Sequence, residues 1–428
     1  MNPKSLSTLF LRGTFYRLAC ATVLMYGLTM TAGRIAQAQT FTVLHDFTGG
    51  EDGAEPAAGL TPDGTGNFYG TTTGSGADST GTVFQLRHTG GNWVVKTLVS
   101  GLDRPEGRVV FGPHGNLYGT TSGAQCYSGY FYCGGVYSLR QACSNANCPW
   151  LVSSLYQFGG LGDGANPGTV DPVFDQAGNL YGTTFGGGAS GNGVVFELSP
   201  PADGGLGAWT ETPIYSFTGG SDGQFPASGV IFDSAGNLYG TTESGGDNYH
   251  GTVFELSPSG SGWAIQTLYT FQGGSDGQSP FGGLTLDQFG NLYGTTTAGG
   301  AGGGGTVFKL SPSGGSWTFS VLYGLPGFVG PWNTLLMDAA GNLYGTTVAG
   351  GTYGTGSVFK LTPGNGGWSY TDLFNFKFRD GDVNLTGYQP LSSVTLDTGG
   401  NLYGTAYLGG LTSPTCYPGC GLVWEITP

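Results

Sequence analysis

The chain has 428 residues, a formal charge of −14, 86 glycines and only 9% charged residues. Its aromatic content of 13% excludes a disordered chain, because disordered chains are poor in aromatic residues and rich in charge. The glycines lack the every-third spacing of collagen, and the excess of acidic residues argues against binding to nucleic acid, whose phosphates require Lys and Arg.

Residues 1–38 have the pattern of a secretory signal peptide. A basic start is followed by an apolar run over residues 18–30 and by the small-x-small site Ala36-Gln37-Ala38. A retained N-terminal anchor is the alternative, although the apolar run is short for a membrane span. Cleavage would remove four basic residues and no acidic ones, which lowers the charge from −14 to −18. We therefore expect a secreted protein, extracellular or periplasmic, with no membrane span in the mature chain.

The mature chain is dominated by one repeat. The string Gly-Asn-(Leu/Phe)-Tyr-Gly-Thr occurs seven times at spacings of 49 to 63 residues, which suits one propeller blade per copy. Its asparagines are Asn67, Asn116, Asn179, Asn237, Asn291, Asn342 and Asn401.

Each copy lies in a context of four short strands, which residues 282–323 illustrate. The innermost strand is expected at 283–287, the second at 291–296 and the third at 305–312, and the outermost runs from Trp317 to about Tyr323. Short runs of apolar and β-branched residues between Gly, Pro, Asn and Asp are typical strand signals.

Two residue types recur at fixed places in this unit. An Asp follows the innermost strand and fits a type I turn, and a ring of catalytic or metal-binding carboxylates is the alternative. These are Asp63, Asp175, Asp233, Asp287, Asp338 and Asp397, and Pro113 replaces the Asp in the second copy. A Trp marks the outermost strand and is expected to pack between blades. These are Trp93, Trp150, Trp209, Trp263, Trp317 and Trp368.

Six of the seven cysteines remain after residue 38, and an even number in an exported chain indicates disulfides. They fall in three close pairs, which we expect to be bonded locally: Cys126 with Cys133, Cys143 with Cys148, and Cys416 with Cys420. A zinc site is the competing interpretation, but the spacings are not C-x-x-C and no His lies among them.

The seventh copy stops after its third strand, Gly-Leu-Val-Trp-Glu-Ile-Thr-Pro at 421–428. Residues 41–47 match the outermost strands of other copies, so we expect them to pair with 421–427 and remove an open sheet edge. The sequence thus predicts an all-β, seven-bladed β-propeller over 39–428. It has four antiparallel strands per blade, its last blade is closed by the N-terminal strand 41–47, and it is a monomer.

Ligand binding is expected on the face that carries the loops between outermost and next innermost strands. These loops contain Gly-Gly-x-Asp-Gly-x-x-Pro or its variants, and their carboxylates are Asp52, Asp163, Asp222, Asp276 and Asp380. Such Asp-Gly pairs could hold calcium or a cationic ligand, or they could simply make tight turns. His45, His88, His114 and His250 occupy unrelated repeat positions, so no metal triad and no catalytic set is predicted.

The repeated units resemble a known bacterial family. Gly-Asn-Leu-Tyr-Gly-Thr-Thr, Gly-Thr-Val-Phe-Glu-Leu-Ser-Pro and Gly-Gly-Ser-Asp-Gly-Gln-x-Pro are similar to the GloVer tandem repeat over residues 41–428. The resemblance implies an exported surface or extracellular repeat protein of undefined molecular role. Gly-Leu-x-x-Asp-x-x-Gly-Asn-Leu-Tyr is also loosely similar to the NHL-type propeller repeat, some members of which are lyases or lactonases.

Two functions follow as hypotheses. The first is a secreted binding or scaffolding protein at or outside the cell envelope, with a carbohydrate, peptide or protein partner on its loop-rich face. The second is a metal-dependent hydrolase or lyase with a divalent cation held by Asp side chains at the mouth of the channel. A passive matrix component is a third alternative.

Overall fold

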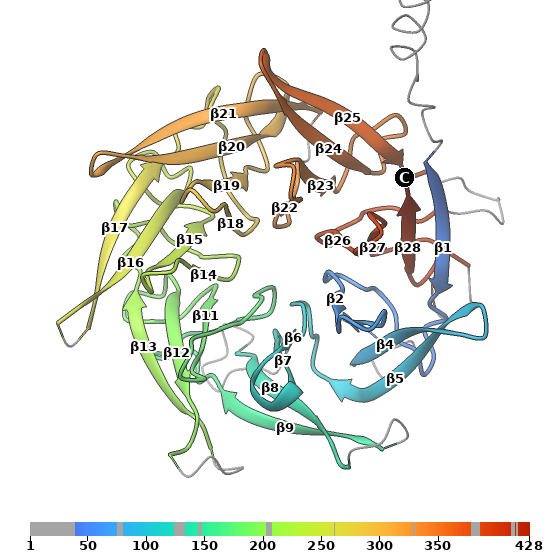
Figure 1. Ribbon diagram of the computed structural model, residues 1–428. Helices are drawn as coiled ribbons and strands as arrows, with labels where there is room; N and C mark the ends of the chain where they lie inside the picture. The colour runs from blue at the N-terminus through green and yellow to red at the C-terminus, as the bar shows by residue number, and fades with distance from the viewer. Residues whose placement is uncertain are drawn as a thin grey trace, which may run out of the picture. The chain divides into compact units, whose positions relative to one another are not determined.

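The computed structural model describes residues 39–74, 80–123, 133–143, 148–202, 208–260, 262–327, 330–377, 386–411, 416 and 418–428. Phe41–Thr427 form one compact unit of seven four-stranded sheets arranged in a ring (Figure 1). Neighbouring strands within each sheet pair in the antiparallel sense. The fold is a seven-bladed β-propeller, which confirms the prediction. In the described ranges the one helical segment is a 3-10 turn, η1 (Pro113–Gly115), where Pro113 replaces the repeated Asp.

The innermost strands are only two residues long, because each makes just two ladder pairs with its neighbour. They are β2 (Thr61–Pro62), β6 (Val110–Phe111), β10 (Val173–Phe174), β14 (Ile231–Phe232), β18 (Thr285–Leu286), β22 (Leu336–Met337) and β26 (Thr395–Leu396). The second strands carry the Leu-Tyr-Gly-Thr string and are buried. They are β3 (Phe68–Thr72), β7 (Leu117–Thr121), β11 (Leu180–Thr184), β15 (Leu238–Thr242), β19 (Leu292–Thr295), β23 (Leu343–Thr347) and β27 (Leu402–Ala406).

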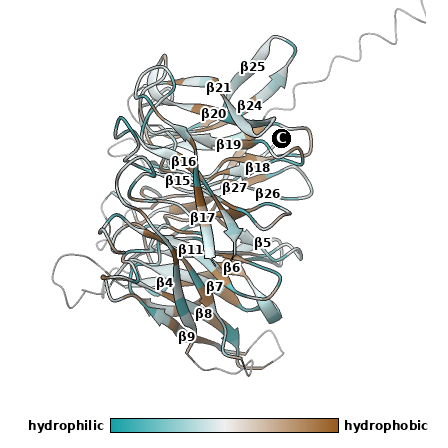
Figure 2. Ribbon diagram, turned by 90° about the vertical axis from the view of Figure 1, so that its left-hand side faces the viewer, coloured by the Kyte–Doolittle hydropathy of each residue, from teal (hydrophilic) through white to brown (hydrophobic). Residues whose placement is uncertain are grey.

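The third and outermost strands are longer, and Figure 2 shows the ring from the side with loops projecting from both of its faces. The third strands are β4 (Gly81–Thr89), β8 (Gly135–Gln141), β12 (Val194–Ser199), β16 (Thr252–Ser259), β20 (Gly303–Ser313), β24 (Ser357–Gly364) and β28 (Leu422–Thr427). The outermost are β1 (Thr40–Asp46), β5 (Asn92–Leu102), β9 (Trp150–Gln157), β13 (Thr210–Ser216), β17 (Gly262–Thr270), β21 (Ser316–Pro326) and β25 (Gly367–Asn375).

The last blade is closed by the N-terminal strand. Its strands follow the order β1-β28-β27-β26, and the blue strand β1 lies beside the red strand β28 in Figure 1. The backbone N–H of Phe47 donates to the carbonyl of Gly421 at 3.0 Å, which continues the pairing past the end of β1. The expected closure by residues 41–47 is confirmed, and β28 has no open edge.

The core between blades is built from stacked phenylalanines. A fully buried Phe that follows an outermost strand meets the Phe of the next blade's third strand, as Phe217 meets Phe254 at 5.2 Å between ring centroids. The Gly of the Leu-Tyr-Gly-Thr string makes room for that second ring, since a Cβ on Gly240 would collide with the ring of Phe254. Because interiors are close-packed, the repeated Gly and Phe have to occur together.

The repeated Trp residues also pack between blades. Trp263 of one blade lies 6.2 Å from Tyr181 of the preceding blade, and Trp317 lies 6.0 Å from Tyr239, both ring centroid to centroid. Trp93 makes the same contact with Tyr403 at 6.1 Å, across the junction of the first and last blades. The expected packing role of the outer-strand tryptophans is confirmed.

The repeated Asp after the innermost strand closes the turn to the second strand. Asp233 accepts hydrogen bonds from the backbone and side-chain nitrogens of Asn237 at 2.9 and 2.8 Å and from the Tyr239 hydroxyl at 3.1 Å. Burial raises the pKa of Asp233, but these hydrogen bonds outweigh burial and hold the pKa below its ordinary value. Asp287, Asp338 and Asp397 repeat the arrangement. The turn interpretation therefore accounts for these carboxylates.

Candidate functional site

The loop that enters each blade is held by a strained residue before a proline. In six blades this residue is not glycine and has a positive φ of 53° to 61°: Glu55, Arg104, Asn166, Phe225, Ser279 and Gln389. Such conformations cost about 1–3 kcal/mol each and persist only where the surroundings impose them. Here the N–H of Phe225 donates to Asn192 of the preceding blade at 2.8 Å, and its carbonyl accepts from Glu243 at 3.0 Å.

The proline itself packs on a glycine of the preceding blade. Gly251 has φ +93°, and a Cβ there would collide with the carbonyl of Thr242 and with Cδ of Pro280. Gly193 with Pro226 and Gly356 with Pro390 repeat this contact. We call these contacts between a proline and a glycine of the preceding blade the proline seam. The proline seam fixes the backbone direction of the residues that follow each proline.

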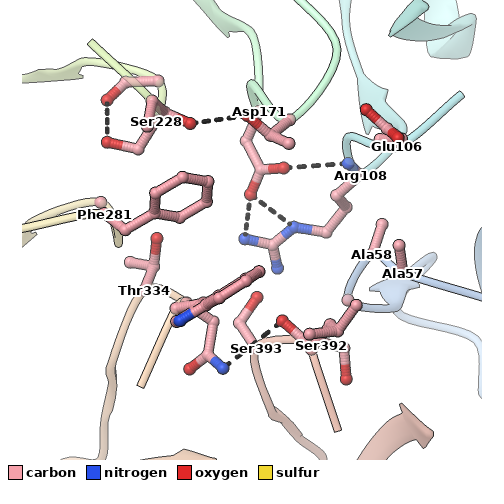
Figure 3. A pocket seen from close by; sticks show the side chains of 18 of the residues that line it. Ala57, Ala58, Glu106, Arg108, Asp171, Ser228, Phe281, Thr334, Ser392 and Ser393 are labelled. Carbon is pink, nitrogen blue, oxygen red and sulfur yellow. Dashed lines mark hydrogen bonds and ion pairs between the residues drawn. The ribbon is translucent and has the colours of Figure 1, made fainter. Parts of the chain in front are cut away.

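Those residues line one cavity of about 370 Å³ at the centre of the ring, within the usual range of ligand pockets. We call the segments that follow the prolines the mouth segments, and all seven blades supply one. They are 57–59, 106–108, 168–171, 227–229, 281–283, 332–334 and 391–393. In Figure 3 their side chains surround a common space, with Ala57 and Ala58 on one side and Phe281 on another.

One side of the cavity is charged. The Arg108 guanidinium donates to Asp171 Oδ2 from Nε at 3.1 Å and from Nη2 at 2.9 Å, and the Arg108 backbone N–H donates to Oδ1 at 2.9 Å (Figure 3). Both side chains remain about a quarter to a third exposed. Glu106 pairs with Arg104 at 2.8 Å, so each carboxylate of this side has a cationic partner. The charges on this side are thus paired, and the side is close to neutral.

The opposite side is aromatic. The rings of Phe281 and Trp332 come from consecutive blades, with centroids 5.2 Å apart and planes inclined by 39°. Trp332 is 41% exposed, whereas the fully buried Trp424 belongs to the core. Leu391 continues this apolar side in the next blade. A partly exposed aromatic pair in a cavity offers a flat apolar face to a ligand.

A hydrogen bond that links neighbouring blades elsewhere in the ring is missing beside Trp332. In six blades the Thr of the Leu-Tyr-Gly-Thr string donates to a carbonyl of the next mouth segment or its proline, as Thr183 does to Ser228 at 2.7 Å and Thr241 to Gly282 at 3.2 Å. The equivalent Thr295 has a buried Oγ1 without a hydrogen-bond partner in the described ranges. Asn333, which lines the cavity and is 6% exposed, has a buried Oδ1 that also has no partner in the described part of the chain. Unpaired buried polar atoms are costly and call for an explanation.

The carboxylates expected to bind a ligand lie in separate turns. Asp222 accepts from the Tyr215 hydroxyl at 2.9 Å and from the Thr218 N–H at 2.7 Å, and Asp276 accepts from Tyr269 and Gln272 in the same way. Asp163 accepts from Tyr156, and Asp52 pairs with His45 at 3.0 Å.

These four aspartates are not among the residues that line the cavity, and Asp380 lies outside the described residues. Burial raises the pKa of Asp222, but hydrogen bonds from Thr218 and Tyr215 hold it below its ordinary value. Within the described ranges no three His, Cys, Asp or Glu side chains gather where they could hold one metal ion. Ligand or calcium binding by these aspartates stays a prediction.

Two of the expected disulfides join described residues. Cys143 is bonded to Cys148 and Cys416 to Cys420, as expected. Cys133 is also disulfide-bonded, while its expected partner Cys126 lies outside the described residues. The carbonyls of Cys133 and Cys420 accept the N–H groups of Asn166 and Glu55, two of the strained residues before the prolines. These cysteines therefore support the backbone that leads into the mouth segments.

Sequence reasoning did not find the cavity. A search for repeats selects residues that recur, whereas the cavity residues Arg108, Phe281 and Trp332 occupy positions at which the copies differ. One signal was present: Trp332 lies directly after a proline, outside the outer-strand positions of the six repeated tryptophans. The predicted signal peptide and its cleavage site lie outside the described residues, and the described part contains no helix with the length and apolar character of a membrane span.

Comparison with known proteins identifies the repeat. Residues 123–330 match the family model described as the Gloeobacter/Verrucomicrobia repeat, so the resemblance to the GloVer repeat is confirmed over that range. The chain has no match among curated proteins.

Solved structures share the fold at low identity. The extracellular domain of a B. thetaiotaomicron protein assigned as a hybrid two-component system has a TM-score of 0.54 and 14% identity, and the match covers 91% of this chain and 42% of that one. A fungal alcohol oxidase of the AA5 family in complex with copper has a TM-score of 0.57 and 12% identity, with 91% and 76% covered. A Bacteroides fragilis protein assigned as a 6-phosphogluconolactonase has a TM-score of 0.51 and 13% identity, with 79% and 94% covered. These likenesses concern the propeller fold alone.

Proposed function

We propose that this chain, whose residues 123–330 belong to the Gloeobacter/Verrucomicrobia repeat family, is an exported propeller that binds a ligand in the cavity of its mouth segments. It acts as a binding or scaffolding protein at or outside the cell envelope. The observation that carries this proposal is the cavity itself, which gathers a partly exposed aromatic pair and a hydrogen-bonded Arg–Asp pair at the centre of the ring.

Two features support the extracellular setting. The chain contains the disulfides Cys143–Cys148 and Cys416–Cys420, which form and persist in oxidising compartments. Residues 1–38 have the composition of a signal peptide. Sequencing the N-terminus of protein recovered from the extracellular or periplasmic fraction tests export: we expect the mature chain to begin at Gln39, and an uncleaved cytoplasmic protein would contradict the proposal.

The hydrolase or lyase alternative receives no support from the arrangement of the described residues. The carboxylates proposed to hold a cation lie in separate turns, where Tyr hydroxyls and backbone N–H groups already bond to them. The charged residues that do line the cavity are engaged in ion pairs. A binding role needs only the shape and chemistry that the cavity presents.

Thermal unfolding of the purified chain with soluble envelope fractions, oligosaccharides and peptides tests the binding role. A ligand present at about 100 times its Kd should stabilise the chain by about 2.7 kcal/mol and raise its melting temperature. Arg108→Ala should abolish this rise, whereas Lys309→Ala, which removes a cation located over Tyr293 outside the cavity, should retain it. No rise with any sample, or an equal rise in both variants, would contradict a binding site in the cavity.

A further inference from the structure

We propose that the ligand of the cavity is a neutral saccharide, stacked on Trp332 and hydrogen-bonded by Arg108, Asp171 and Asn333. This inference rests on the proposed binding function and names its ligand class.

The aromatic side fits the shape of a sugar ring. A pyranose ring has a face of C–H groups, which is apolar, and an edge of hydroxyl groups, which is polar. Phe281 and Trp332 provide two neighbouring aromatic rings that line the cavity, and Trp332 is 41% exposed. Aromatic side chains supply such rigid apolar surface at little conformational cost.

The charged side supplies matching groups for hydroxyls. A hydroxyl both donates and accepts, so it is best recognised where a donor and an acceptor are held side by side. Arg108 uses Nε and Nη2 toward Asp171, and its Nη1 makes no hydrogen bond within the described residues. The Asp171 carboxylate retains acceptor capacity beside it and is partly exposed. The fixed pair can therefore bond two adjacent hydroxyls of one sugar.

Asn333 supplies the observation that points most directly to a missing donor. Its Nδ2 donates to Thr346 Oγ1 at 2.5 Å, but its Oδ1 accepts nothing from the described residues, although the side chain is only 6% exposed and lines the cavity next to Trp332. Buried amide oxygens are rarely left unpaired. Because this oxygen has less than 1 Å² of accessible surface, an O–H group of a ligand stacked on Trp332 satisfies it only after the Asn333 side chain turns toward the cavity.

The charge of the lining argues for a neutral ligand. Its charged residues are one cation and two carboxylates, and the cation is already bonded to a carboxylate. A phosphate or a nucleotide would need unpaired cations, and the chain as a whole is strongly acidic. An amine would find Asp171 and Glu106 already paired with arginines. A neutral, hydroxyl-rich ring requires none of these pairs to break.

Isothermal titration of the chain from residue 39 tests the inference with short neutral oligosaccharides of glucose, mannose, xylose and galactose, acidic oligogalacturonate, and peptides. We expect at least one neutral oligosaccharide to bind. Trp332→Ala and Asn333→Leu should each weaken binding at least about tenfold, equivalent to about 1.4 kcal/mol. Trp317→Phe, which alters a Trp of an outermost strand, should bind as the unaltered chain does.

The outcomes separate the two proposals. Peptide binding that Trp332→Ala abolishes, without any saccharide binding, overturns the saccharide inference and leaves the binding function standing. Saccharide binding that is equal in Trp332→Ala and Asn333→Leu to that of the unaltered chain also overturns the inference, because the sugar then binds elsewhere. A preference for oligogalacturonate over every neutral chain contradicts the neutral ligand. No binding of any probe, together with no thermal shift by envelope fractions, overturns both.

Discussion

Two segments of every blade can be compared within this one chain: the turn after the innermost strand and the mouth segment before it. The turn keeps its Asp, Asn and Tyr through most copies, and the bond from Asn291 to Asp287 at 2.7 Å is the same as that from Asn342 to Asp338. The mouth segments begin at equivalent prolines but continue with Ala57, Glu106, Phe281 or Trp332. Six of these segments have the same length and the third, 168–171, is one residue longer, so the copies differ mainly in the side chains that face the cavity.

This difference distinguishes residues that the fold requires from residues that face the cavity. A residue recurs where the backbone or the packing between blades requires it, as Gly240 must leave room for the ring of Phe254. A residue is free to differ where it faces the cavity, since the proline seam fixes the backbone before and the turn fixes it after. Stability should therefore depend on the repeated residues and binding on the mouth segments.

The largest effect is expected in the repeated core. Phe217→Ala removes a fully buried ring between two blades and should lower the free energy of unfolding by about 3–5 kcal/mol. Phe289→Ala, at a ring that is 73% exposed, is the matched control and should change it by less than about 0.5 kcal/mol. Guanidinium unfolding measures both, and equal losses would refute the assignment of the core.

The proline seam should give the next largest effect. Gly251→Ala places a Cβ at φ +93° against Thr242 and Pro280, and should cost more than about 2 kcal/mol, because the backbone penalty of about 1–2 kcal/mol is joined by a steric clash. Gly260→Ala has φ +61° with open space around it and should cost only the backbone penalty. If both variants lose the same stability, the seam does not constrain the mouth segments.

Glu211 places a carboxyl group at a position that is apolar in other blades, and it should make stability depend on pH. It pairs with Leu198 in the ladder at the register where other blades carry Ile265 or Phe319. Burial, with a smaller contribution from Asp163, raises the pKa of Glu211 to about 7. In the unfolded chain the Glu211 carboxyl has a pKa near its ordinary value. The folded chain is therefore most stable, as far as this group is concerned, below that pKa, and this stability falls as the pH rises to about 7.

Glu211→Gln should remove this fall and make the variant the more stable protein at pH 8, by roughly 1–2 kcal/mol for a half-buried carboxyl screened by solvent. Thermal unfolding at pH 4, 6 and 8 compares the two chains. A difference that does not change with pH would show that Glu211 titrates normally.

The smallest effect on stability is expected at the mouth. Trp332→Ala removes a side chain that is 41% exposed, and should lower the free energy of unfolding by no more than about 1 kcal/mol. Trp424→Ala, at a fully buried Trp, should cost about 3–5 kcal/mol. A reversed order would mean that the mouth segments hold the ring together and would break the comparison.

The same division explains what could be predicted from the sequence. Seven copies of one string, with Trp at the outermost strand, were enough to predict the blades, and the missing strand of the last copy was enough to predict closure by residues 41–47. The innermost strands are two residues long rather than five: in the fifth blade the ladder holds only the pairs Thr285–Tyr293 and Leu286–Leu292.

The cavity could not be predicted in this way. Residues such as Arg108 and Asp171 are 63 positions apart, and only the ring closure of the blades makes them neighbours. Asp222 was conspicuous because it recurs with its Gly, yet its bonds to Tyr215 and Thr218 depend on the path of the loop, which no local pattern reveals.

Fluorine NMR of the chain with 5-fluorotryptophan tests the central claim most directly. The chain has eight tryptophans, and their resonances report in one spectrum on the packing between blades and on a mouth segment. On addition of a neutral oligosaccharide that binds, the resonance assigned to Trp332 through Trp332→Phe should shift, while those of the six outer-strand tryptophans stay in place. Shifts at the outer-strand indoles with Trp332 unmoved would contradict a ligand site built from the residues in which the blades differ.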